Sequence, residues 1–228
     1  MGGPRVNTTD PWLADVTVAL ADTGKRLAAA GLSPGSTGNI SVLRDGRVAM
    51  TGTGTDLSDL RPDGIAELTL DGTHVHGPRP SKEVAMHLAM YARNPTHGAC
   101  VHVHSPFSVA ASCLAPWSAT SAIPPITPYF VMRVGQTPLI PYRAPGHPEI
   151  GALIRDEPTP SRAVLLANHG QVVSGTDTAD ALEAAIELEE ACRISVLTAG
   201  HDRRLLSEDD AIELADRYGT PWTRRSLQ

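Results

Sequence analysis

The sequence has 228 residues and is 41% hydrophobic, which is enough for one domain with a substantial core. Its formal net charge of −6 argues against a nucleic-acid-binding protein, which would usually present a basic face. It contains no run of 18 apolar residues and no apolar signal core near its start, so we expect neither a membrane span nor a secretory signal. Three cysteines, Cys100, Cys113 and Cys192, have apolar neighbours, which predicts buried, reduced thiols in a cytoplasmic protein.

Helical and strand-like segments alternate along the chain. Hydrophobic spacing and capping residues predict helices over 11–30, 80–95, 105–115, 176–200 and 207–219. Short apolar runs predict strands within 46–54, 97–105, 137–142 and 163–170. The glycine-rich segments 33–41 and 51–55 are expected to be loops, and three prolines exclude a central strand at 121–132. The pattern predicts a single α/β domain in which helices cover a sheet.

Two histidines stand one residue apart in the apolar stretch ACVHVHS. Residues two apart on a strand share a face, so His102 and His104 can direct both imidazoles at one metal ion. Partly exposed or hydrogen-bonded histidines are the alternative interpretation of this pattern. His74 and His76 have the same spacing, but their Gly, Thr and Asp neighbours favour a surface turn.

A catalytic zinc site needs a third protein ligand and an open position. His169 is the candidate, because it ends an apolar strand in LLANHG, and strand ends are where α/β folds place their sites. Glu83 offers a carboxylate at the start of a helix, although an acidic residue there is also favoured by the helix dipole alone. Packing or surface roles are expected for the other isolated histidines, His87, His97, His147 and His201.

Two glycine loops complete the candidate site. The segments GSTGNIS (Gly35 to Ser41) and TGTGT (Thr51 to Thr55) offer backbone amides and hydroxyls that suit a concave anion site. Taken singly, each is also typical of an ordinary turn.

The order of the motifs GSTGNIS, TGTG, PSKE, VHVHSP, PYRAPG and LLANHG resembles the class II aldolase and adducin family from about residue 12 to residue 218. The resemblance implies a single-domain, three-layer αβα fold with a mostly antiparallel central sheet. We expect this domain to span 11–219, between a flexible N-terminus (1–10) and a C-terminal tail (220–228). It also implies Zn²⁺, or Mn²⁺ or Co²⁺, bound by the three histidines, with Glu83 as a further ligand or as the acid–base group.

The same resemblance implies a substrate site and an assembly. Family members bind a sugar phosphate with residues that match Ser36, Asn39, Thr53, Gly54 and Ser81 here. They form homotetramers with sites between subunits. Tyr129 and Tyr218 match positions that reach the neighbouring subunit's site.

Lys82 separates this chain from the sugar-phosphate aldolases of the family, which have a second serine at its position. With S/T-K-E, TPYFVMRVG and LLANHG, the chain most resembles the 3-oxo-tetronate 4-phosphate decarboxylase subgroup. The expected reaction forms dihydroxyacetone phosphate and CO₂ through a metal-stabilised enediolate. We expect Lys82 to bind the phosphate, because a cation on the departing carboxylate would stabilise the ground state. The alternatives are a zinc aldolase acting on a sugar phosphate such as fuculose 1-phosphate, and a non-catalytic adducin-like interaction domain.

Overall fold

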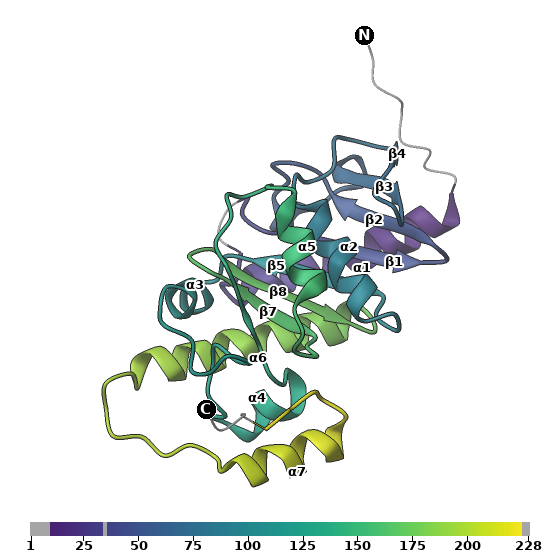
Figure 1. Cartoon of the computed structure of the whole chain (residues 1–228). Helices are drawn as coiled ribbons and strands as arrows, with labels where there is room; N and C mark the ends of the chain where they lie inside the picture. Colours follow the sequence, from purple (N-terminus) through teal and green to yellow (C-terminus); the bar gives the residue numbers. More distant parts are fainter. Residues whose placement is uncertain (1–9, 34–35, 225–228) are drawn as a thin grey trace.

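An eight-stranded sheet with the order β4-β3-β2-β1-β5-β8-β7-β6 forms the centre of the computed structural model, which describes residues 10–33 and 36–224 (Figure 1). Every neighbouring pair is antiparallel except β6 and β7, which run parallel. The strands are β1 (Asn39–Arg44), β2 (Arg47–Thr51), β3 (Ile65–Thr69), β4 (His74–His76), β5 (Ala99–Val103), β6 (Leu139–Ile140), β7 (Ala163–Leu166) and β8 (Gly170–Gly175). The predicted α/β class with a mostly antiparallel sheet is confirmed.

Seven α-helices surround the sheet or extend from it. They are α1 (Pro11–Ala29), α2 (Val84–Arg93), α3 (Pro106–Ser112), α4 (Pro128–Arg133), α5 (Glu149–Asp156), α6 (Thr178–Leu197) and α7 (Glu208–Tyr218), counted over the described residues. Two short 3₁₀ helices, η1 (Leu57–Asp59) and η2 (Pro62–Gly64), connect β2 to β3. Local sequence sets several helix starts: the carboxylates of Asp10 and Asp177 accept from backbone amides of the first turns of α1 and α6. Ser207 and Asp210 form a capping box on α7.

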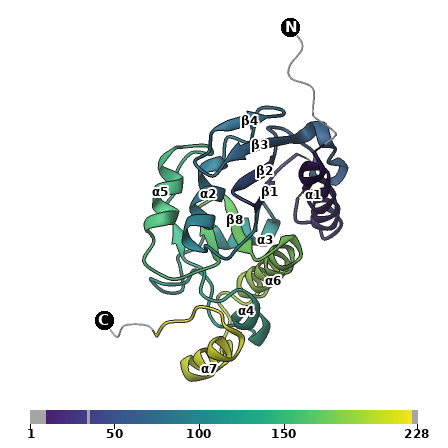
Figure 2. The same cartoon turned by 90° about the vertical axis from the view of Figure 1, so that its right-hand side faces the viewer.

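Two hydrophobic cores fill the two faces of the sheet. On one face, residues of α1, α3 and α6 pack on alternate strand residues such as Val101 and Val103. On the other, residues of α2 and α5 pack on Cys100, Val164 and Val172. Figure 2 shows α2 and α5 on one side of the sheet and α1 on the other, which confirms the three-layer arrangement. Because side chains alternate along β5, His102 and His104 share the α2 face with Cys100.

Helices α4 and α7 form a smaller unit beyond α6, on the side away from β1–β4 (Figures 1 and 2). Val131 of α4 packs on Ala211 and Ala215 of α7. The chain then returns along α4, where the Thr220 hydroxyl donates to the Val131 carbonyl (2.7 Å) and Thr223 binds the Gln136 side chain. Residues 220–224 of the expected tail are therefore bound to the fold. The expected flexible N-terminus, apart from residue 10, and the last four residues lie outside the described part.

Three expectations are wrong. The segment expected to be a loop through Ser41 ends earlier, because Asn39–Ser41 begins β1. Pairing of all three residues with β5, and of Ser41 also with β2, overrides the polar, small-residue composition. His74 and His76 lie on the edge strand β4 rather than in a turn, although the strand is largely exposed as expected. Cys113 is exposed, since it follows the end of α3, whereas Cys100 and Cys192 are buried. No helix in the described ranges is long and apolar enough to cross a membrane.

Candidate metal centre

Three elements bring four side chains together at one end of β5. His102 lies within β5, and His104 follows its last residue. His169 lies in the turn between β7 and β8, and β8 is the neighbour of β5 in the sheet. Glu83 is the N-cap residue of α2, on the face of the sheet to which the β5 histidines point. The grouping predicted from the sequence is therefore present, with all four ligand atoms within 4.8 Å of one another.

The ring nitrogens face one another at short distances. The Nε2 atom of His104 is 2.9 Å from Nε2 of His102 and 3.0 Å from Nε2 of His169. Oε2 of Glu83 lies 3.4 Å from Nε2 of His102, and Oε1 of Glu83 lies 3.5 Å from Nε2 of His169. His102, His169 and Glu83 are buried, and His104 is half-buried.

The histidines have the protonation that metal binding requires. Burial, followed by the neighbouring His104 and His169, holds the pKa of His102 well below its usual range. Burial also lowers the pKa of His104, and it lowers that of His169 to about 4. Neutral imidazoles are the ligand form, so this site needs no proton release from these rings near neutral pH.

The donor set fits a divalent ion. Nδ1 of His102 donates to the Gln171 carbonyl (2.8 Å), which leaves the lone pair on Nε2 directed at the cluster. Oε1 of Glu83 is buried and has no hydrogen-bond partner among the described residues. A buried carboxylate oxygen is costly to leave without a partner, and a cation between it and the three Nε2 atoms would provide one. Three imidazoles and a carboxylate suit zinc and neighbouring transition metals.

The backbone of residues 168–170 packs closely against β5. Asn168 has a φ of +56°, a left-handed conformation that asparagine tolerates, and this turns the chain into His169. A Cβ atom at Gly170 would lie 2.6 Å from the Val103 carbonyl oxygen. On the opposite edge of β5, a Cβ atom at Gly38 would lie 2.6 Å from the His102 carbonyl oxygen. Both flanking segments therefore require glycine to reach the histidine strand.

The predicted phosphate residues mostly line the same region. Asn39 donates through Nδ2 to Oε2 of Glu83 (2.8 Å), so its amide is engaged with the cluster. Thr53 donates to the Pro80 carbonyl (2.8 Å), which places the loop containing Gly54 beside buried Ser81. The Ser81 hydroxyl accepts from the backbone amide of Glu83 (3.3 Å). Ser36 is exposed.

Lys82 is exposed, but its charge acts on the cluster. The ammonium contributes to the lowered pKa of both His104 and His169, after burial in each case. Its carbon chain lies against Gly146, where a Cβ atom would come within 3.0 Å of Lys82 Cδ. The cation is therefore close enough to the histidines to affect them, and its carbon chain packs on the PYRAPG loop.

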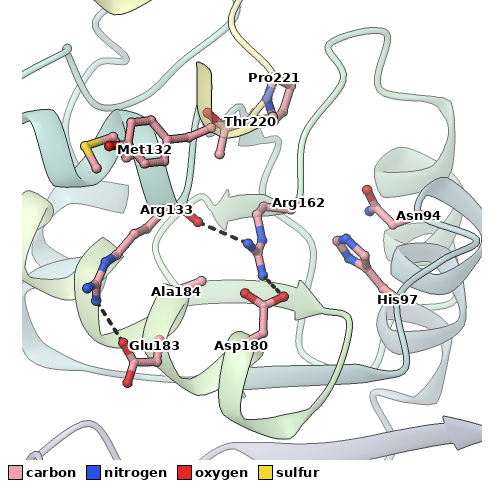
Figure 3. Close-up of a pocket in the computed structure, with 12 residues that line it drawn as sticks. Asn94, His97, Met132, Arg133, Arg162, Asp180, Glu183, Ala184, Thr220 and Pro221 are labelled. Carbon is pink, nitrogen blue, oxygen red and sulfur yellow. Dashed lines mark hydrogen bonds and ion pairs between the residues drawn. The ribbon is translucent and has the colours of Figure 1, made fainter. Parts of the chain in front are cut away.

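Tyr129 and Tyr218 lie elsewhere on the chain and are 57% and 53% exposed. Tyr218 and His97 both line a cavity of about 440 Å³. Figure 3 shows this cavity with His97. His97 precedes β5, whereas His104 follows β5. The cavity and the histidine cluster are thus at opposite ends of β5. Two ion pairs occupy the cavity, Arg133 with Glu183 (2.8 Å) and Arg162 with Asp180 (2.7 Å), so its guanidinium groups are already matched by carboxylates.

Sequence reasoning missed residues that support the cluster. The carboxylate of Glu189 on α6 accepts from the Ser105 hydroxyl and from the amides of Phe107 and Ser108, and so anchors the chain directly after His104. His87, expected to have a packing role, is fully buried and hydrogen-bonded to Asn39. A signal for it was present, because Glu83, His87 and Tyr91 are spaced four residues apart and share a helix face.

Comparison with known proteins agrees with this geometry. Residues 18–196 match the family described as Class II Aldolase and Adducin N-terminal domain. A 3-oxo-tetronate 4-phosphate decarboxylase from Haemophilus influenzae is 40% identical over 87% of this chain and 95% of its own length. A 5-deoxy-D-ribulose 1-phosphate aldolase from Bacillus thuringiensis is 31% identical over 86% of this chain and 91% of its own. The crystal structure of YgbL from Klebsiella pneumoniae superposes with a TM-score of 0.83 at 37% identity, covering 89% of this chain and 98% of that one. The chain therefore belongs to the class II aldolase and adducin N-terminal domain family.

Proposed function

We propose that the chain is a metal-dependent carbon–carbon lyase that converts a 3-oxo-tetronate 4-phosphate to dihydroxyacetone phosphate and CO₂. The observation that carries the lyase chemistry is the convergence of three Nε2 atoms on Glu83, whose Oε1 has no partner among the described residues. Five relatives named as 3-oxo-tetronate 4-phosphate decarboxylases, 36–40% identical to this chain, support the reaction type.

The proposed ligands are His102, His104, His169 and Glu83, and zinc is the proposed ion, with Mn²⁺ and Co²⁺ compatible with the same donors. When bound, the ion supplies Lewis-acid stabilisation of the negative charge that develops on the ketone oxygen of the substrate.

The bond changes are simple. The C1–C2 bond breaks, CO₂ leaves, and the electron pair passes to C2 and the 3-ketone oxygen. A proton then adds to C2 and gives dihydroxyacetone phosphate. Glu83 is the proposed proton donor in its protonated form, as an alternative to its role as a fourth ligand, because its Oε1 has no hydrogen-bond partner among the described residues while Asn39 holds Oε2.

Lys82 is proposed to bind the substrate phosphate. Its charge reaches His104 and His169, and it is the one lysine near the cluster, since the only other lysine of the sequence is Lys25 on α1. The proposed anion site also uses Ser36, Asn39, Thr53, Gly54 and Ser81. A compact cation suits a phosphate group.

We further propose a cytoplasmic homotetramer with sites between subunits. Tyr129 and Tyr218 are exposed, and Tyr218 lies at the opposite end of β5 from the cluster of its own chain. A role for it in catalysis would therefore require a neighbouring subunit's site. Free thiols at Cys100, Cys113 and Cys192 agree with a reducing compartment. Light scattering should report four chains per particle.

An aldolase acting on a sugar phosphate is the second candidate, favoured by the 31% identical aldolase and by a metal cluster that would suit either reaction. An adducin-like interaction domain is disfavoured, because a non-catalytic module has no need for a complete set of four ligands.

Paired substrates and one substitution test the proposal. A charge-assisted contact is worth about 1.5–3 kcal/mol, so Lys82→Ser should lower kcat/KM for the phosphorylated acid by about 10- to 100-fold. The loss should be much smaller on the unphosphorylated acid, and Lys25→Ser should change neither value. Equal losses on both acids would remove Lys82 from the phosphate. Cleavage of fuculose 1-phosphate with the phosphorylated acid untouched would favour the aldolase.

A further inference from the structure

A chain of buried hydrogen bonds leads away from Glu83 into the core between β1 and α2. Oε2 of Glu83 accepts from Nδ2 of Asn39 (2.8 Å), and Oδ1 of Asn39 is 2.5 Å from Nε2 of His87. Nδ1 of His87 is 2.7 Å from the Ser41 hydroxyl, which is 2.6 Å from the Tyr91 hydroxyl. All five residues are buried, and His87 and Ser41 are 0% exposed.

The contacts allow only one direction for this chain. A carboxylate only accepts, so Asn39 must direct its NH₂ group at Glu83 and its carbonyl oxygen at His87. His87 must then carry its proton on Nε2, which leaves Nδ1 to accept from Ser41. The Ser41 hydroxyl has a single hydrogen, so Tyr91 must donate to it. Each donor points toward Glu83.

Resting on the proposed role of Glu83 in the metal site, we propose that His87 is a positioning residue that fixes the Asn39 amide and thereby orients the Glu83 carboxylate, whose Oε2 lies 3.4 Å from Nε2 of His102 and whose Oε1 lies 3.5 Å from Nε2 of His169. Without the Nε2–H donor, the Asn39 amide could rotate and present its oxygen to the carboxylate. That arrangement would repel Oε2 and release Glu83 from its orientation.

Burial of His87 and Tyr91 keeps the hydrogen-bond chain in this arrangement near neutral pH. Burial lowers the pKa of His87 to about 3, so the ring stays neutral and its tautomer is decided by hydrogen bonding alone. Tyr91 closes the far end of the chain, and burial raises the pKa of its hydroxyl, so it remains a donor. Residues on β1 and α2 are thus combined into one support for Glu83.

The first test reads the tautomer directly and needs neither metal nor substrate. ¹⁵N NMR of histidine-labelled protein, with His87 assigned by its absence from His87→Gln, should show a neutral ring protonated on Nε2 from pH 5 to 8. A ring protonated on Nδ1 would reverse the chain and overturn the proposal.

The second test measures Co²⁺ affinity by competition with a chelator. Loss of a support of this kind typically costs about 10- to 100-fold in metal affinity, which is the weakening expected for His87→Leu. His87→Gln keeps an N–H donor toward Asn39 and should stay within about threefold of wild type by the same reasoning. Met90→Leu, a buried change on the same helix, controls for altered packing of α2.

A double-mutant cycle separates positioning from general damage. In a Glu83→Ala background, His87→Leu should weaken Co²⁺ binding by no more than about twofold, because residues that act through one another are not additive. An equal loss in both backgrounds, or an equal loss for His87→Gln and His87→Leu, would contradict the proposal. Neither readout uses the reaction, so a wrong substrate would leave both tests intact.

Discussion

Acidification should lower the free energy of unfolding of the metal-free protein, and the His87→Gln variant isolates the part of this loss that His87 causes. The folded pKa of His87 is about 3, below the ordinary value of 6.5, because burial disfavours the charged ring. The unfolded chain therefore binds a proton that the folded chain does not. This contribution to stability is complete above about pH 6.5 and is lost progressively as the pH falls toward 3. At pH 5, 1.5 pH units below 6.5, the loss is about 2 kcal/mol, at 1.36 kcal/mol per unit.

The assay compares wild type with His87→Gln in the presence of a chelator. Urea unfolding, followed by circular dichroism at pH 5, 6, 7 and 8, gives the free energy of unfolding of each protein. The metal-ligand histidines are present in both, so their contributions cancel in the difference. Between pH 8 and pH 5, wild type should lose about 2 kcal/mol more than the variant. A difference between the two proteins that stays constant with pH would refute a buried, neutral His87.

Three further predictions concern the cluster. Elemental analysis of purified protein should find about one divalent ion per chain. The His102→Ala variant should lose this ion, and the His74→Ala variant should keep it. Folded, metal-supplemented wild type that contains no metal would argue against the site. Glu83→Gln should lower kcat while metal stays bound if the protonated carboxyl group of Glu83 donates the proton to C2, whereas loss of metal would make Glu83 mainly a ligand. Gly170→Ala should weaken Co²⁺ binding and lower the melting temperature, since its Cβ would lie 2.6 Å from a carbonyl oxygen; wild-type values for both would show that the strand can shift without consequence.

Much of the candidate site was predictable because the spacing of its residues in the sequence determines which side chains share a face. Two histidines two residues apart on a strand must share a face, and the N-H-G turn after an apolar strand places a third at the same sheet edge. Glu83 was predictable only in combination with these, because an acidic residue at a helix start has an ordinary explanation. The resemblance to a family decided between the two interpretations.

The remainder depends on pairings that no local pattern reveals. Asn39–Ser41 has the composition of a polar loop, yet it begins a central strand, because all three residues pair with β5 and Ser41 also pairs with β2. His87 acts through Asn39, which is 48 residues away in the sequence, and Glu189 acts through partners at least 81 residues away. Their roles therefore become visible only once α2 and α6 are packed on the sheet. Cys113 was expected to be buried from its apolar neighbours, but α3 ends just before it.

The most direct measurement is the product ratio from a synthetic 3-oxo-tetronate 4-phosphate with metal-loaded protein. CO₂ and dihydroxyacetone phosphate should form in equal amounts, and both should disappear with a chelator or with His102→Ala. Metal-loaded, folded protein that releases no CO₂ from this acid would contradict the account.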